Sequence, residues 1–140
     1  MLHSISAVST VDVPHYVADN GTLVVMEGLT HVPFAIARVF SIIASVGAVR
    51  GQHAHRACSQ ILICPIGRVE VQCDDGHEVF TYILDRPYSG LLVPPSIWAK
   101  QTFLALGSVL TVLCDRPYEV DDYIRDYVDF KRYRRDDGTY

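Results

Sequence analysis

The sequence lacks the long apolar runs and the excess of positive charge that mark two large classes of protein. No apolar stretch reaches the roughly 20 residues that a membrane span requires. The first residues show no basic flank followed by an apolar run, so we expect no secretory signal peptide. The formal net charge is -4, which argues against a nucleic-acid partner. The one basic cluster, residues 131–135, is followed by two aspartates, and we expect a solvated tail over residues 131–140.

Cysteine is also scarce, and its spacing excludes the common paired motifs. The four cysteines form no C-x-x-C pair, and three of them lie among apolar or β-branched neighbours. This pattern favours reduced cysteines, several of them in the core, and a cytoplasmic protein. The cysteines are Cys58, Cys64, Cys73 and Cys114.

The composition is sufficient for one domain with its own core. The chain has 140 residues, of which 49% are apolar and 20% are charged. A chain of this length can bury a core without disulfide or metal staples. No repeat, low-complexity segment or linker divides the sequence, so we expect a single domain over residues 1–140.

Short runs of β-branched and aromatic residues, separated by Gly, Pro and Asp, dominate the chain. Their length and regular spacing predict an all-β sandwich or barrel rather than βαβ units. Asp74-Asp75-Gly76 is a hairpin signal. The only helical stretch that we expect is a turn or two over residues 121–127, with acidic residues at its start. The expected strands cover residues 22–26, 34–43, 60–64, 68–72, 78–84, 90–93 and 108–113.

Two histidines, His53 and His55, are the main candidates for chemistry. Residues two apart on a strand point to the same face, so both imidazoles would line one cavity if that face is the barrel interior. Such a pair can bind a metal or supply acid and base groups near neutral pH. Two histidines two apart are also common by chance, so the surrounding spacing decides between these readings.

That spacing resembles the first sequence motif of the cupins, which fold as double-stranded β-helix (jelly-roll) barrels. Gly47 and Gly67 frame the histidine pair at the motif's distances, with Gln60 where the motif usually carries glutamate. A second motif would fall at residues 90–99, and its metal-binding histidine position is occupied by Ala99. Two of the four usual ligands are therefore missing, and two imidazoles alone make a poor metal site. We expect no metal.

A closer resemblance runs from about Gly21 to Tyr133. It is to the sugar 3,4-ketoisomerases, cupins that act on dTDP-4-keto-6-deoxyglucose. The resemblance implies an enzyme that moves the keto group from carbon 4 to carbon 3 without metal or cofactor, for the synthesis of 3-amino sugars. The residues that carry it are Arg50-Gly51-x-His53-Ala54-His55, Gln60, Asp75-Gly76, Gly90-Leu91, residues 94–98, Tyr118, residues 122–127 and Phe130.

The resemblance implies that His53 and His55 are the acid–base couple of this reaction. Removal of the proton at carbon 3 leaves an enediol or enediolate, and a proton must then reach carbon 4. Which histidine acts on which carbon stays open. The oxyanion needs a cation or donor, and we consider Arg50 and Arg38 for that task or for the diphosphate.

Three further side chains are candidates for substrate binding. Gln60 could orient a histidine or bind a sugar hydroxyl, and Trp98 or Tyr118 could stack on the thymine. Each candidate also has a structural interpretation. Arg38 could form an ion pair with Glu27, Trp98 could cap the barrel, and Tyr118 could be a packing residue.

Three positions depart from the family's usual pattern. Asn20 stands where an arginine is frequent, Phe40 where a tyrosine is frequent, and Ala99 where a histidine is frequent. These departures leave the sugar, the nucleotide base and the configuration at carbon 4 open.

Other functions remain as alternatives. A non-catalytic cupin that binds a nucleotide sugar is compatible with the departures. A nucleotide-sugar epimerase would need a tyrosine acid, which Phe40 does not offer, and a metal cupin such as a dioxygenase would need the absent ligands. Family members form dimers, and a strand over residues 5–8 could pair across a twofold axis and cover an open sheet edge, so we expect a homodimer.

Overall fold

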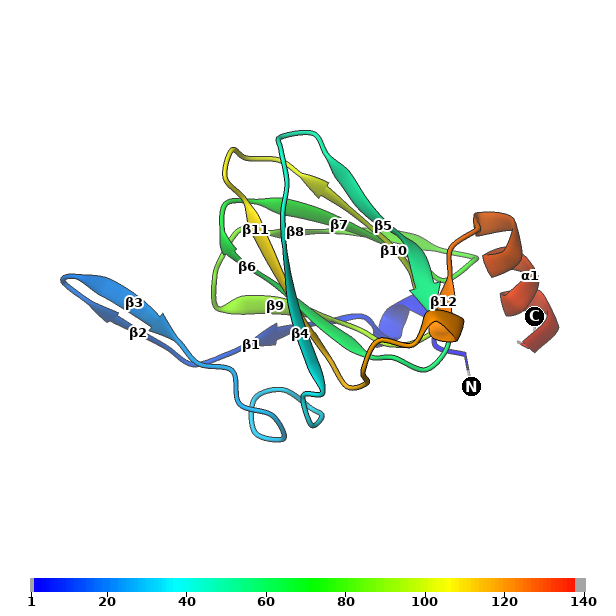
Figure 1. The fold of residues 1–140 in the computed structure, drawn as a ribbon, viewed down its shortest axis with the longest axis horizontal. Helices are drawn as coiled ribbons and strands as arrows, with labels where there is room; N and C mark the ends of the chain where they lie inside the picture. Colours follow the sequence, from blue (N-terminus) through cyan, green and yellow to red (C-terminus); the bar gives the residue numbers. More distant parts are fainter. Residues whose placement is uncertain (1, 138–140) are drawn as a thin grey trace.

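The computed structural model describes residues 2–137, in which two five-stranded antiparallel sheets face each other as the layers of a barrel (Figure 1). The first sheet contains, in order, β1 (Ser9–Asp12), β9 (Ser89–Val93), β6 (Gln60–Ile66), β11 (Val109–Cys114) and β4 (Arg38–Ile43). The second contains β12 (Tyr123–Ile124), β5 (Val49–His55), β10 (Trp98–Phe103), β7 (Val69–Asp74) and β8 (Val79–Leu84). The predicted all-β class is confirmed.

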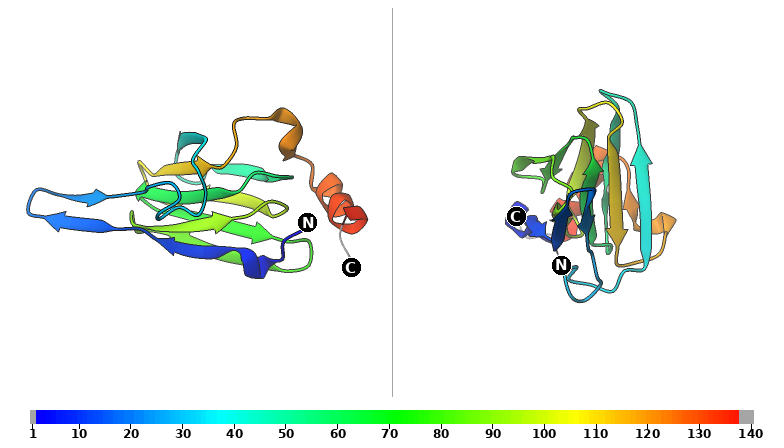
Figure 2. Two further views of the ribbon diagram at one scale, coloured as in Figure 1. Left: turned by 90° about the horizontal axis from the view of Figure 1, so that it is seen from below. Right: turned by 90° about the vertical axis from the view of Figure 1, so that its left-hand side faces the viewer.

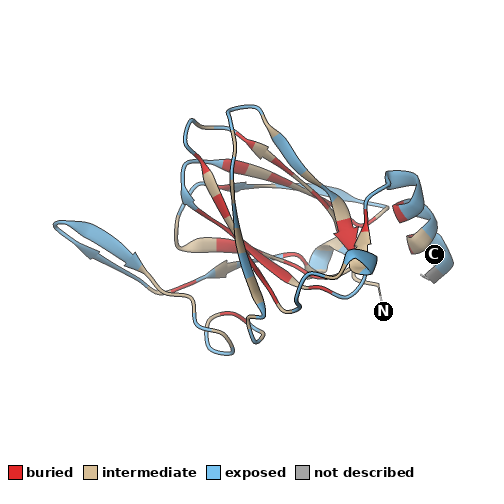
Figure 3. Cartoon of the chain, in the orientation of Figure 1, coloured by how far each residue is buried: buried red, intermediate tan, exposed pale blue. Residues whose placement is uncertain are grey.

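The core lies between the two sheets and follows from the alternation of side chains along the strands. In β10, for example, Ala99, Gln101 and Phe103 are buried, while the residues between them are partly exposed. The buried cluster draws on both sheets and includes all four cysteines, which are free, as expected. Figure 3 shows this buried band along the central strands.

The hairpin of β2 (His15–Ala18) and β3 (Gly21–Val24) projects from the barrel, whereas the α-helix α1 (Tyr127–Asp137) lies at the opposite end (Figures 1 and 2). The hairpin exposes apolar side chains, because 61% of Tyr16, 76% of Val17 and 60% of Leu23 are accessible. The described helices include none that is long and apolar enough to cross a membrane.

Several predicted strands are confirmed with small changes of boundary. The hairpin signal at residues 74–76 does join two paired strands, β7 and β8. The strand predicted over residues 34–43 begins only at Arg38, because the preceding residues form turns closed by hydrogen bonds from the Leu29 backbone N–H. No run that we predicted as a strand corresponds to β1, β2 or β10.

The predictions for the two chain ends were wrong in detail. Residues 5–7 form a 3₁₀ turn, η1 (Ile5–Ala7), and the strand that follows at Ser9 pairs with β9 of the same chain. The predicted helix over residues 121–127 is instead a short 3₁₀ turn, η2 (Val120–Asp122), followed by strand β12.

The α-helix begins later, and its start is explained by a cap. The Asp126 carboxylate accepts a hydrogen bond from the backbone N–H of Asp129 at 3.0 Å, which satisfies a free amide of the first turn. The helix continues to Asp137, so residues 131–137 belong to it rather than to the solvated tail that we expected. Residues 138–140 lie outside the described part. The buried Arg134 guanidinium donates to the backbone carbonyls of His3 at 2.7 Å and Ser96 at 2.8 Å, which ties both chain ends to the barrel.

Candidate active site

A cavity of about 550 Å³ opens between the β4 edge of one sheet and the β12 edge of the other. Polar and charged side chains enter it from both sheets, so the space is suited to a polar ligand rather than to a lipid. The lining residues are Phe40, Ser41, Ile42, Val49, Arg50, Gly51, His53, Gln60, Gln101, Val112, Tyr123 and Arg125.

A β-bulge in β5 sets the position of His53. The pairing with β10 shifts between Ala99, opposite His53, and Lys100, opposite Gly51. Gly51 and Gln52 both have positive φ, and a Cβ on Gly51 would lie 2.5 Å from Oε1 of Gln101. Glycine is therefore favoured at position 51, because its φ of +81° strains any side chain and a Cβ would also lie 3.0 Å from the Ala99 backbone carbonyl.

His53 is a neutral imidazole at the cavity wall. Burial, together with the neighbouring His55 ring, lowers the pKa of His53 to about 4. The Nδ1 atom of His53 is buried without a hydrogen-bond partner among the described residues. A neutral histidine that borders a cavity is able to accept a proton at neutral pH.

His55 lies behind His53 and is held by Asp122. The two imidazole rings meet edge-on with their centroids 5.0 Å apart, and His55 is not among the residues that line the cavity. Nδ1 of His55 lies 2.9 Å from Oδ2 of Asp122, to which it donates because a carboxylate only accepts. Burial lowers the pKa of His55 despite this carboxylate, so the ring stays neutral. The expectation that both imidazoles line one cavity therefore holds for His53 alone.

The same carboxylate organises the loop after β5. Oδ1 of Asp122 accepts the backbone N–H of Ala57 at 2.6 Å, and Oδ2 accepts that of Cys58 at 3.3 Å. We call this group, made of His55, Ala57, Cys58 and Asp122, the Asp122 clasp. It joins the end of β5 to the segment that carries β12.

The metal expectation can be tested on the residues of the clasp. Ligand atoms of His55, Cys58 and Asp122 lie within 4.8 Å of one another. Both carboxylate oxygens of Asp122 already accept hydrogen bonds, and a hydrogen bond with Cys114 together with burial raises the pKa of the Cys58 thiol well above its ordinary value. A metal needs a thiolate and free oxygen lone pairs, so these donors do not fit one.

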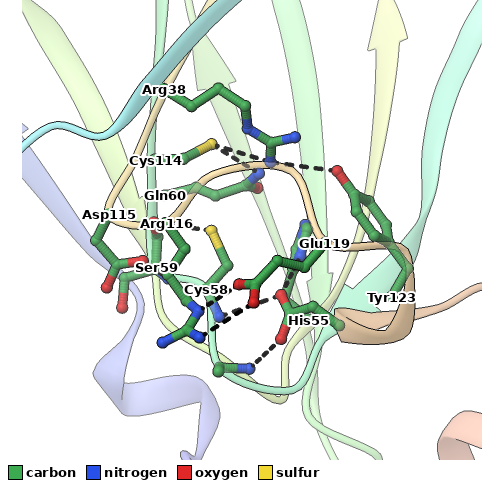
Figure 4. A network of polar contacts seen from close by, with 12 residues as sticks. Arg38, His55, Cys58, Ser59, Gln60, Cys114, Asp115, Arg116, Glu119 and Tyr123 are labelled. Carbon is green, nitrogen blue, oxygen red and sulfur yellow. Dashed lines mark hydrogen bonds and ion pairs between the residues drawn. The ribbon is translucent and has the colours of Figure 1, made fainter.

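A second polar network reaches the cavity from the β4 side (Figure 4). Nη2 of Arg38 donates to the Tyr123 hydroxyl at 3.3 Å and to Sγ of Cys114 at 3.5 Å, and Nε2 of Gln60 also donates to Cys114. Hydrogen bonding from Cys58, with help from Gln60 and Arg38, lowers the pKa of Cys114 to about 6. Cys114 therefore accepts from both Arg38 and Gln60 and holds the Arg38 guanidinium in place.

Of the other predicted site residues, some line the cavity and some do not. Arg50 and Gln60 line the cavity. Trp98 does not, because its ring packs on Tyr127 and Phe130 of α1, with centroids 5.2 and 5.5 Å away. Tyr118 is 58% exposed and lies outside the lining, with its ring 5.5 Å from the Arg38 guanidinium carbon.

Arg38 does not form the ion pair with Glu27 that we considered as its structural role. The Glu27 carboxylate accepts from the Thr30 hydroxyl, and within residues 2–137 no ion pair involves Arg38. The Nε atom of Arg38 is buried and unpartnered in the same region. This guanidinium is therefore directed at Tyr123 and Cys114 rather than neutralised by an acid.

The sequence did not identify several cavity residues, and two of them, Tyr123 and Arg125, lie close to the histidine pair. Tyr123 lies 5.0 Å from the His53 ring and 4.3 Å from the His55 ring, and Arg125 covers its other side at 4.2 Å. Both residues belong to the 122–127 segment that we had read as helical. A signal was present, because this segment carries the resemblance described above.

Comparisons with known proteins agree with this geometry. A family model described as "FdtA: WxcM-like, C-terminal" matches residues 6–135. A TDP-4-oxo-6-deoxy-alpha-D-glucose-3,4-oxoisomerase from Aneurinibacillus thermoaerophilus is 39% identical over 114 residues, which are 81% of this chain and 82% of that protein.

Solved structures show the same architecture. The sugar 3,4-ketoisomerase QdtA from Thermoanaerobacterium thermosaccharolyticum, in complex with TDP, is 28% identical with a TM-score of 0.92, over 97% of this chain and 100% of that one. A histidine-to-asparagine mutant of QdtA, in complex with TDP-4-keto-6-deoxyglucose, is 29% identical with a TM-score of 0.89, over 94% and 98%.

Proposed function

This chain belongs to the FdtA family (WxcM-like, C-terminal), and we propose that it is an isomerase that moves the keto group of dTDP-4-keto-6-deoxyglucose from carbon 4 to carbon 3. The observation that carries the proposal is His53, a neutral imidazole that borders a polar cavity of about 550 Å³. The curated relative is named as an oxoisomerase of that sugar, and QdtA has been solved with TDP and with the keto sugar.

His53 is the proposed base of the reaction. It removes the proton at carbon 3, and the electron pair of that bond forms the double bond of an enediolate with charge on the oxygen at carbon 4. The imidazolium then returns a proton to carbon 4. His55 is the second member of the proposed acid–base couple and packs against the His53 ring. Asp122 accepts from Nδ1 of His55 and so fixes its ring, which leaves Nε2 as the atom with a free lone pair.

The two arginines of the initial hypothesis receive different tasks. Arg38 is part-buried and bonded to Tyr123 and Cys114, so it suits a fixed positive charge beside the enediolate. Arg50 lines the cavity and is itself exposed, which suits contact with the diphosphate. Gln60 donates its amide N–H to Cys114, and its carbonyl oxygen is assigned to a sugar hydroxyl.

Tyr118 is the aromatic side chain that we favour for stacking on the thymine. Its ring lies next to the Arg38 guanidinium and 5.5 Å from the Tyr123 ring, whereas Trp98 is covered by α1. The nucleotide is then held by Tyr118 and Arg50 while the sugar ring extends toward His53.

We further propose a homodimer. The β2–β3 hairpin projects from the barrel with Tyr16, Val17 and Leu23 largely exposed, and such apolar surface is typical of a contact with a second copy. The enzyme is proposed to work in the cytoplasm, in the synthesis of deoxyamino sugars, and four free cysteines are compatible with that compartment.

The test is incubation with dTDP-4-keto-6-deoxyglucose in deuterated water, followed by NMR of the sugar. We expect conversion to the 3-keto isomer with solvent deuterium at the carbon that receives the proton. Tight binding with neither conversion nor exchange would contradict the proposal and favour a non-catalytic module that binds nucleotide sugars.

A further inference from the structure

The Tyr123 hydroxyl lies in the cavity wall without a role in the histidine chemistry proposed above. Its oxygen accepts a hydrogen bond from Nη2 of Arg38 at 3.3 Å (Figure 4). The ring contacts both histidines. A phenol that accepts from a guanidinium keeps its own hydrogen for another acceptor. No such acceptor for this hydrogen occurs among the hydrogen bonds of the described residues, and Tyr123 lines the cavity.

Few other groups of the cavity could do the work of this hydroxyl. Of the residues that line it, only Ser41 also carries a hydroxyl, and that group is bonded to the Thr111 hydroxyl at 3.0 Å. Phe40, on the wall formed by β4, has no hydroxyl. The phenol of Tyr123 is therefore the free hydroxyl of the described lining.

The proposed reaction moves two hydrogens, and a carbon base accounts for only one of them. The substrate has C4=O and H–C3–O–H, whereas the product has H–C4–O–H and C3=O. The hydrogen on carbon 3 goes to carbon 4, and the hydrogen on the oxygen at carbon 3 must leave while the oxygen at carbon 4 gains one. Carbon 4 is reduced and carbon 3 is oxidised within one molecule, so no external oxidant or reductant is needed.

Resting on the proposed function, we infer that Tyr123 is the catalytic residue that transfers hydrogen between the two oxygens, while His53 transfers it between the two carbons. The phenol donates its hydrogen to the oxygen at carbon 4 as the enediolate forms. It then takes the hydrogen of the hydroxyl at carbon 3 as that C=O bond forms, so its own charge is unchanged after one turnover.

Arg38 is the positioning residue of this transfer. Its N–H holds the phenol oxygen and stabilises the negative charge that Tyr123 carries between the two steps. Cys114 and the stacked Phe40 ring hold the guanidinium in place, at 3.5 Å from Sγ and with its central carbon 5.3 Å from the ring centroid.

The variant that tests this inference is Tyr123→Phe, which keeps the ring contacts with both histidines and removes only the hydroxyl. We expect kcat to fall about 100-fold, the scale of one acid–base group, with KM changed less than threefold. The enediolate should then return to substrate more often than it proceeds. In deuterated water, the ratio of deuterium at carbon 3 of recovered substrate to product formed should rise at least tenfold over the parent protein.

The matched control is Tyr82→Phe, which removes a phenol from β8, a strand that does not contribute to the cavity lining. We expect its kcat and isotope ratio to equal those of the parent protein. Circular dichroism and thermal unfolding of both variants separate a loss of chemistry from a loss of fold.

Two results for Tyr123→Phe would overturn the inference. One is a kcat within threefold of the parent value. The other is an equal fall in exchange and in product formation, which would show that the hydroxyl orders the cavity rather than transfers hydrogen. These failures leave the proposed function intact, whereas a parent protein that neither converts nor exchanges the keto sugar would overturn the proposed function and this inference with it.

Discussion

The Asp122 clasp and the cavity wall meet where the rings of His55 and His53 touch, yet the Asp122 carboxylate and the polar atoms of the cavity wall differ in how fully they are hydrogen-bonded. In the clasp, both oxygens of the Asp122 carboxylate accept hydrogen bonds at 2.6 to 3.3 Å. In the cavity wall, buried Nδ1 of His53 and Nε of Arg38 have no partner among the described residues.

The difference separates groups that hold the fold from groups that are kept for a ligand. A buried polar atom left without a hydrogen bond costs about 1–3 kcal/mol, and two of the four such atoms among the described residues, on His53 and Arg38, lie at the cavity. The two histidines of β5 differ at Nδ1, which is bonded to Asp122 in His55 and has no partner among the described residues in His53. A sequence motif that names both histidines together does not reveal this difference.

The variant with the largest expected effect is His53→Asn, which tests the cavity side of this comparison. Asparagine keeps polarity at the cavity wall but cannot accept a proton from carbon, so we expect turnover to fall about 1000-fold or more with the fold retained. The measurement is the rate of 3-keto sugar formation, with circular dichroism as the check on folding.

His55→Asn is the matched variant. The asparagine amide can reproduce the donor that His55 presents to Asp122, so the clasp should survive and the loss of turnover should be smaller than for His53→Asn. Equal and near-normal rates in both variants would show that neither histidine moves a proton.

Acid titration sharpens the same contrast. Because the pKa of His53 is lowered to about 4, the ring stays neutral and kcat/KM should remain level from pH 8 down to about pH 5. A midpoint near pH 6.5, the ordinary histidine value, would contradict a desolvated base.

The stability of the protein should respond to pH through the same group. The unfolded chain binds a proton on His53 near pH 6.5 and the folded chain only near pH 4. The contribution of His53 to the free energy of unfolding is therefore fully present above pH 6.5. It should fall by roughly 3 kcal/mol as pH drops from 6.5 to 4, and His53→Asn should remove this part of the slope. Urea unfolding at several pH values measures both.

Asp122→Asn tests the other side of the comparison, because it removes hydrogen-bond acceptors from the Asp122 clasp. The amide can accept at one position but presents an N–H to a donor at the other, so we expect about 2 kcal/mol of destabilisation. That corresponds to a fall of roughly 6–10 °C in Tm for a domain of this size. Turnover should fall only about tenfold, because His53 keeps its place in β5. An unchanged Tm would show that the clasp does not stabilise the fold.

The smallest expected effect is that of a chelator, which should be none. The clasp already uses the donors that a metal would need. Turnover measured before and after dialysis against EDTA should agree within error. A loss that added divalent metal restores would overturn our reading of His55, Cys58 and Asp122.

The sequence was most informative where alternation and turn residues agree. The 68–72 and 78–84 runs, with Asp74-Asp75-Gly76 between them, predicted β7 and β8 well. Strand β10 was missed because Gln101, a polar residue, occupies one of its buried positions and hides the alternation. The helix was placed too early because the acidic residues at 121 and 122 suggested a helix start, whereas Asp122 is used by the clasp and Asp126 is the cap.

For the site, the motif identified residues but not their surroundings. His53, Arg38, Arg50 and Gln60 do meet around one cavity or its polar network. Tyr123 joins them only because β12 pairs with the end of β5, a contact between residues 68 positions apart, as Tyr123 lies opposite His55. Trp98 alternates to the outer face of β10, where α1 covers it.

The hydrogen bonds of Arg134 have a consequence for how the protein is made. This side chain donates to the backbone carbonyls of both His3 and Ser96. His3 precedes Arg134 by 131 residues. A ribosome adds roughly 5–20 residues per second, so roughly 7–26 s separate the synthesis of His3 from that of Arg134. The N-terminal segment has earlier contacts as well, from the His3 N–H to Ser96 Oγ and from the Ile5 N–H to Asp75 Oδ2, so Arg134 adds the last fastening to a turn that the barrel already holds.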